Sequence, residues 1–140
     1  MNEQNYKNHA RMHPIYHFVL SLLVLGGFIT AVTNVFQSDH TLGAVTLLLL
    51  ASALLVTFTL LRLYPLKAQD RAIRAEENLR HFVLTGKLLD DRLTPGQIVA
   101  LRFAPDEEFP SLAEKAAAEG LKPKEIKQAV VNWRGDYYRI

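Results

Sequence analysis

Two apolar stretches decide the fold of this chain: IYHFVLSLLVLGGFITAVTNVF, residues 15–36, and TLGAVTLLLLASALLVTFTLL, residues 41–61. A helix of this length extends about 33 Å at 1.5 Å per residue, enough to cross the hydrocarbon core of a bilayer. Between Pro14 and Leu61 the only formal charge is Asp39, and most charges follow Leu61. The rest of the chain is too short to cover two such helices inside a soluble protein. We therefore predict two transmembrane helices.

The connection between the two stretches predicts their orientation. Residues 37–40 form a polar loop without Lys or Arg, so short that the helices must be antiparallel neighbours. Basic residues flank the other ends of both helices: Lys7, Arg11, Arg62, Lys67, Arg71 and Arg74. The positive-inside rule then places the loop outside and both termini in the cytoplasm. Interspersed acidic residues favour a topology signal and a solvated face over a polybasic lipid-binding segment.

A cleaved signal peptide is the competing interpretation of the first stretch. Residues 31–33 faintly resemble a small-residue cleavage site, but the apolar run is longer than a signal peptide requires. Small residues also offer close helix packing, at Gly27 and Ala31 in the first stretch and at Ala51 and Ser52 in the second. We expect these four residues to pack the two helices against each other, with a homodimer contact as the alternative.

The predicted fold class is all-α, because no strand pattern occurs anywhere. We divide the chain into a cytoplasmic N-terminal tail (1–13), a transmembrane hairpin (14–64) and a cytoplasmic helical domain (65–140) made of one long helix and three short ones. Pro65 should kink or end the second span, and Gly86 should end the long helix. Its apolar stripe, expected to pack on another element, consists of Ala68, Ala72, Ala75, Leu79 and Phe82.

Capping signals place the three short helices. Thr94-Pro95-Gly96-Gln97 has the form of a capping box and starts a helix that runs to about Phe103. A second helix starts near Pro110 and ends at Gly120, and Pro123 opens the last one. Apolar residues at helical spacing on this last helix, together with the aromatic residue that follows, predict a partner interface: Ile126, Val130, Trp133, Tyr137 and Tyr138.

Composition excludes several classes of function. The chain has no Cys, which removes disulfides, thiolate metal sites and Cys nucleophiles, and its net charge of +2 is too small to favour nucleic acid. No phosphate-binding loop, nucleophile elbow or HExxH motif occurs, and neither span holds a charge that would mark an ion path. We therefore expect no enzymatic activity, no small-molecule substrate and no cofactor.

Two weaker alternatives stay open. His13 and His17, with His9 four residues earlier, could ligate haem or a metal on one helix face, although Pro14 interrupts that helix. Ala116, Gly120 and Ile126 match the spacing of a helix-turn-helix, whose second helix would carry Lys122, Lys124 and Lys127. Acidic residues among these lysines dilute the positive face that DNA requires.

Three segments, QNYKNHARMHPIYHFVL (4–20), KAQDRAIRAEENLRHFVLTGKLLD (67–90) and LTPGQIVALRFAPDEEFPSLAEKA (93–116), carry a resemblance. They look like those of a family of small bacterial membrane proteins known only as a domain of unknown function. The resemblance covers nearly the whole chain and implies a two-span protein of the bacterial cytoplasmic membrane, with no known activity. The predicted function is a membrane-anchored adaptor or accessory subunit whose tail docks a protein partner or a second copy.

Overall fold

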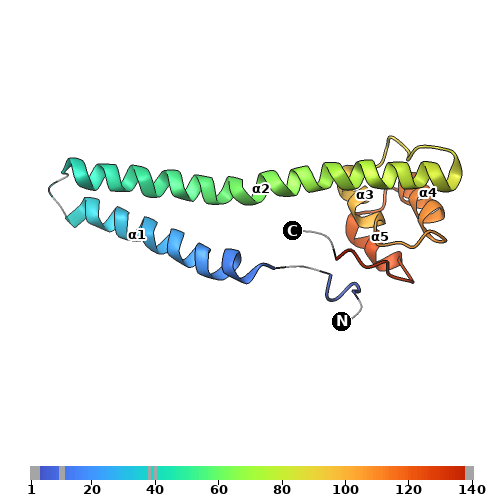
Figure 1. Ribbon diagram of the computed structural model, residues 1–140, viewed down its shortest axis with the longest axis horizontal. Helices are drawn as coiled ribbons and strands as arrows, with labels where there is room; N and C mark the ends of the chain where they lie inside the picture. The colour runs from blue at the N-terminus through green and yellow to red at the C-terminus, as the bar shows by residue number, and fades with distance from the viewer. Residues whose placement is uncertain (1–3, 10–11, 38, 40, 138–140) are drawn as a thin grey trace. The chain divides into compact units, whose positions relative to one another are not determined.

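The computed structural model describes residues 4–9, 12–37, 39 and 41–137 (Figure 1). Within these residues the chain is helical and holds no strand, which confirms the all-α prediction. It divides into two compact units, one of residues 11–65 and the other of residues 1–10 with 66–140. Residues 4–9 therefore belong with the C-terminal part of the chain.

The first unit is built from the two apolar stretches. It contains a π-helical segment, η1 (Ile15–Leu20), then α1 (Ser21–Gln37) and the first part of α2 (Leu42–Thr85). The Ser21 hydroxyl donates a hydrogen bond (3.1 Å) to the carbonyl of Tyr16, five residues earlier, which matches the wider π-helical turn. The Tyr16 hydroxyl donates to the carbonyl of Phe58 (2.8 Å), and the two rings stack 4.7 Å apart.

Both helices of this unit are long and apolar enough to cross a membrane. Only 11% and 6% of their most apolar windows are buried within the protein. A core helix of a soluble protein is mostly covered by its own chain, because apolar area in contact with water costs about 25 cal/mol per Å². These two helices instead expose large side chains such as Leu22, Phe36 and Leu42.

Packing inside the first unit partly differs from the prediction. Ala31 is fully buried, as are Val24 and Ala44 to nearly the same degree, and Ala51 and Ser52 are half-buried. Gly27 is exposed, with no atom within 4 Å of the position that a Cβ would take, so its place in the packing seam was predicted wrongly. The i,i+4 spacing put Gly27 beside Ala31, but the buried residues of α1 are Val24 and Ala31, one heptad apart.

Helix α2 continues through Pro65, where a kink or an end was predicted. Proline removes one backbone hydrogen bond, and a helix can continue when its flanking turns remain bonded. The helix ends at Thr85, followed by Gly86 with φ 75°, whose N–H donates to the Phe82 carbonyl (2.8 Å). The predicted stop at Gly86 is confirmed.

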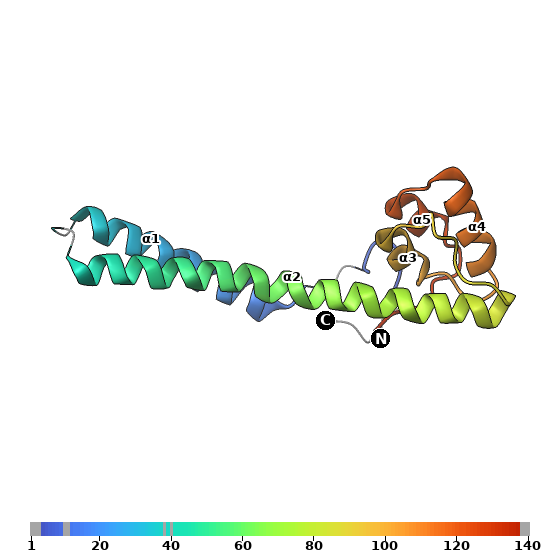
Figure 2. The same cartoon turned by 90° about the horizontal axis from the view of Figure 1, so that it is seen from above.

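The second unit gathers three short helices beside the C-terminal end of α2, as both views show (Figures 1 and 2). These are α3 (Pro95–Leu101), α4 (Phe109–Glu119) and α5 (Pro123–Ala129). The predicted capping box is present: the Gln97 N–H donates to Thr94 Oγ1 (3.3 Å), and the Thr94 N–H donates to Gln97 Oε1 (2.7 Å). Helix α4 ends at Gly120, whose φ of 63° is left-handed.

The core of the second unit joins all three short helices. Its largest fully buried side chains are Leu101, Phe103, Phe109 and Ile126. The helix predicted to run to about Phe103 ends at Leu101, with Arg102 as its C-cap. The predicted extent of the last helix was wrong: α5 stops at Ala129, and the chain becomes extended at Val130 (φ −67°, ψ 120°). The extended segment is held by the Glu108 carboxylate, which accepts the backbone N–H groups of Val131 and Asn132 (both 2.9 Å).

Candidate functional site

The predicted partner interface is mostly part of the core. Ile126 is 0% exposed and Val130 is also buried, so neither can contact a partner without unfolding. Trp133 is half-buried against the core, with its ring 4.7 Å from that of Phe103. Tyr137 alone is exposed (60%), and Tyr138 lies outside the described residues. The prediction failed because it extended a helical period beyond Ala129, where the helix ends.

The face of α2 that packs on the second unit was also predicted wrongly. Ile73 and Glu77 are buried, at 7% and 5% exposed, whereas the predicted stripe is exposed, with Leu79 at 64% and Phe82 at 50%. The stripe was chosen by counting apolar residues only. A signal for the true face was present in Glu77 and Arg80, an i,i+3 pair that can be buried because its charges neutralise each other.

Glu77 and Arg80 begin a charged network between α2 and the short helices. Arg80 contacts Glu77 (2.9 Å) and Asp106 (2.6 Å), donates to the Ala104 carbonyl (2.8 Å), and lies 4.4 Å from the centre of the Phe109 ring. Charge-assisted hydrogen bonds of this kind are about twice as strong as neutral ones. The network therefore fixes α2 against the loop before α4.

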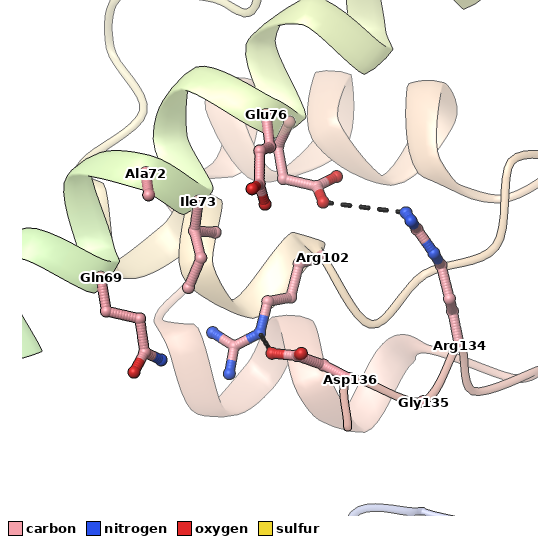
Figure 3. Close-up of a pocket in the computed structure, with 9 residues that line it drawn as sticks. Gln69, Ala72, Ile73, Glu76, Arg102, Arg134, Gly135 and Asp136 are labelled. Carbon is pink, nitrogen blue, oxygen red and sulfur yellow. Dashed lines mark ion pairs between the residues drawn. The ribbon is translucent and has the colours of Figure 1, made fainter. Parts of the chain in front are cut away.

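A cavity of about 340 Å³ lies beside this network (Figure 3). Gln69, Ile73 and Glu76 face it from α2, and the opposite wall holds Arg102, Arg134, Gly135 and Asp136. Arg102 pairs with Asp136 (2.8 Å), and Arg134 lies 3.8 Å from Glu77. Because both signs of charge line the cavity and pair with each other, it favours neither an anion nor a cation. Its geometry is that of a polar contact between packed elements.

The N-terminal residues pack onto the second unit. The backbone N–H of Asp136 donates to Gln4 Oε1 (2.7 Å), and His9 lies with its ring 5.6 Å from that of Trp133 and its Nε2 3.3 Å from Lys127 Nζ. The chain before α1 and the chain after α5 thus hold each other. Sequence reasoning treated residues 1–13 as a separate tail and missed these contacts, which no local pattern encodes.

Two carboxyl groups of the second unit have lowered pKa values. Hydrogen bonds from Arg92 hold the pKa of Asp90 at about 2, below its ordinary value of 3.8. Burial raises the pKa of Glu108, but the bonds from Val131 and Asn132 outweigh it and leave the pKa below its ordinary value. Both groups act by accepting hydrogen bonds in the charged form, which is a structural role.

Of the two histidines predicted as ligands, His17 has its ring hydrogen-bonded to the backbone of His13. The Nδ1 of His17 lies 2.9 Å from the His13 carbonyl and 3.1 Å from the His13 backbone N. In the part of the chain that the structure describes, no group of three or more His, Asp or Glu residues could hold a metal ion. The two histidines thus have no third ligand beside them among those residues.

The helix-turn-helix spacing corresponds to a packed corner between α4 and α5. Ala116 and Ile126 are fully buried in the shared core, and Gly120 makes the turn. Helix α5 has only 7 residues, about 10 Å at the usual rise. Lys122 and Lys124 are exposed on it, and Lys127 lies over the Phe103 ring at 5.9 Å.

The flanking basic residues are mostly solvent-exposed. Lys7, Lys67, Arg71 and Arg74 are exposed in the second unit, and Arg62 is half-buried in the first. Arg11 lies outside the described residues.

Comparison with known proteins gives a family and no activity. Residues 1–140 match the model described as "Family of unknown function (DUF6526)". The chain belongs to this family. This confirms the resemblance to an uncharacterised family seen in the sequence. No curated protein and no solved structure matches the chain.

Proposed function

We propose that this member of DUF6526 is a membrane-anchored adaptor or accessory subunit of the bacterial cytoplasmic membrane. Residues 15–36 and 41–61 form a transmembrane hairpin with both termini in the cytoplasm, and the helical tail docks a protein partner. The observation that carries the proposal is the exposure of two long apolar helices, only 11% and 6% buried in their most apolar windows. Lipid is the environment that removes such a surface from water.

The character of the second unit supports the interaction role. Its charges pair internally, as in the network of Glu77, Arg80 and Asp106, and Arg102 pairs with Asp136 in the cavity, where the buried Gln69 Oε1 is without a hydrogen-bond partner among the described residues. A catalytic site would instead present several unpaired, convergent polar groups. The unit keeps exposed apolar side chains on α2, Leu79 and Phe82, and at its C-terminal end, Val131 and Tyr137. These replace the predicted Ile126 and Val130 as candidate contacts.

Purification of the full chain in mild detergent tests the interaction role. We expect a co-purifying protein that is retained by the control variant Lys115→Ser, at an exposed position of α4, and lost in Tyr137→Ser. A chain that purifies alone, or a co-purifying protein retained equally by both variants, contradicts docking through the surface around Tyr137.

Binding to DNA is a second candidate, favoured by one observation. Ala116, Gly120 and Ile126 occupy the helix, turn and helix positions that the motif requires. Titration of the full chain in detergent with duplex DNA at increasing salt tests it, because phosphate contacts weaken steeply with salt. Absence of salt-dependent binding at low ionic strength removes this candidate.

A further inference from the structure

Five side chains of α2 form an exposed apolar seam, which we call the α2 seam: Ala68, Ala72, Ala75, Leu79 and Phe82. Their spacing of four, three, four and three residues averages 3.5, the period of the a and d positions of a coiled coil. All five are exposed in the second unit, where a soluble surface helix would normally carry polar residues. The seam therefore has the pattern of a helix contact without its partner helix.

The rest of the second unit covers little of the α2 seam, because it packs around Ile73 and Glu77 and, among the described residues, reaches the seam only at Ala72, which lines the edge of the cavity. Glu77, the most buried residue of this part of α2, lies two residues after Ala75 and two before Leu79. At 100° per residue, two residues turn about 200°, so Glu77 points away from both. Helix α2 thus uses one face for its own tail and presents the other.

We propose that the α2 seam is the contact between two copies of this chain, arranged parallel and in register. Taking Ala72 and Leu79 as a positions places Arg71 at g and Glu76 at e of the next heptad. In a parallel pair, g of one helix faces the following e of the other. Arg71 of each copy would then face Glu76 of its partner, giving two opposite-charge contacts by symmetry. Both residues are exposed and neither forms an ion pair within the described ranges; Glu76 lies at the border between the α2 seam and the cavity, which it also lines.

The parallel arrangement rests on the proposed membrane anchor. Two copies inserted with the same topology direct α2 the same way, and confinement to one membrane raises their effective concentration. This matters because a seam of about two heptads is marginal as an isolated coiled coil. The three alanines allow close approach of the helices, while Leu79 and Phe82 supply most of the apolar area.

Single cysteines test the contact in membranes holding the full chain, which has no native Cys. We expect Ala68→Cys, Ala75→Cys and Phe82→Cys each to form a disulfide-linked dimer on oxidation, at least fivefold more than Arg74→Cys. Arg74 is the matched control because it is exposed on the same helix, away from the seam. Linkage at Ala75→Cys alone contradicts the parallel register, and equal linkage at Arg74→Cys, or a linked product with another protein, overturns the proposal.

Charge reversal provides a second, independent arm. In the Ala75→Cys background, Arg71→Glu places like charges at both flanking contacts and should weaken the dimer roughly tenfold. Adding Glu76→Arg reverses both partners and should restore the linkage. Disulfide linkage that is unchanged by Arg71→Glu, or that is not restored by adding Glu76→Arg, contradicts the register. Alkaline carbonate washing of the same membranes separates the two proposals. A chain that resists extraction but forms no disulfide-linked dimer overturns only this inference. A chain that is extracted from the membranes overturns the anchor.

Discussion

At the scale of single residues, a buried ion pair fixes the second unit against α2. The carboxylate of Glu77 is 5% exposed and lies 2.9 Å from Arg80. Removing Glu77 takes away one of the two carboxylates that Arg80 contacts, while Asp106 still compensates the charge of Arg80. Glu77→Ala should therefore destabilise the tail by about 1.5–3 kcal/mol, the usual contribution of a hydrogen bond to a charged group.

Thermal unfolding in detergent, followed by fluorescence of the single tryptophan, Trp133, measures this change. Glu114→Ala, at an exposed position of α4, is the control and should shift stability by less than about 0.5 kcal/mol. Equal effects of the two variants would show that the Glu77 and Arg80 contact contributes nothing.

Ile126 distinguishes a core residue from an interface residue. It is fully buried, so Ile126→Ala should lower the free energy of unfolding by about 2–5 kcal/mol. The exposed Val131→Ala serves as control, with an expected change below about 0.5 kcal/mol. The same fluorescence melt measures both. A stable Ile126→Ala variant that only loses a binding partner would return this residue to the interface that the sequence predicted.

The lowered pKa of Asp90 predicts a local pH dependence. Because its folded pKa is about 2 and its ordinary value is 3.8, the contact with Arg92 is complete above pH 3.8 and is lost as the pH falls through about 2. Titration of the Asp90 carboxyl by NMR should give a midpoint near 2. In Arg92→Gln the midpoint should rise toward 3.8, and an unchanged midpoint would contradict the assigned cause.

At the scale of elements, a left-handed glycine terminates α4. Gly120 has φ 63°, a conformation that costs other residues about 1 kcal/mol. Gly120→Ala should lower the tail melting temperature by roughly 4–8 °C, and Gly120→Asn by less because Asn tolerates this region. An alanine variant as stable as the asparagine variant would show that the turn relaxes to a right-handed conformation.

Elements with local start and stop signals were predictable from the sequence. The Thr94 capping box, Pro123 at the start of α5 and the glycines at 86 and 120 each act within one or two turns of chain, so a sequence contains the whole signal. The sequence left open whether Pro65 would kink the helix or end it, and α2 continues through this residue. The choice depends on whether the flanking turns remain hydrogen-bonded, which a local sequence does not specify.

The packed faces of the helices were predicted wrongly for a different reason. The burial of Glu77 depends on Arg80 and Asp106, and the extended segment after Ala129 depends on the carboxylate of Glu108. Asp106 lies 26 residues from Arg80 in the sequence, and Asn132 lies 24 residues from Glu108. A hydrophobic period read along one helix does not contain them. For the same reason the candidate contact residues changed from Ile126 and Val130, which are buried, to exposed side chains such as Leu79.

At the scale of the whole molecule, the chain combines a proposed apolar membrane anchor with a helical unit whose exposed side chains are proposed to contact partners. The anchor is proposed from two helices whose apolar windows are only 11% and 6% buried, and the dimer contact depends on both copies sharing one topology. If the anchor is wrong, the parallel arrangement loses its basis. Both the anchor and the dimer contact therefore depend on the topology of the chain in the membrane.

Labelling of single cysteines in intact cells tests that topology most directly. Asp39→Cys lies in the connection between α1 and α2, and Glu114→Cys lies at an exposed position of α4. With a membrane-impermeant thiol reagent, we expect Asp39→Cys to be labelled in intact bacteria, and Glu114→Cys only after lysis. Labelling of Glu114→Cys in intact cells, or protection of both positions with the chain washed off by carbonate, would contradict the account.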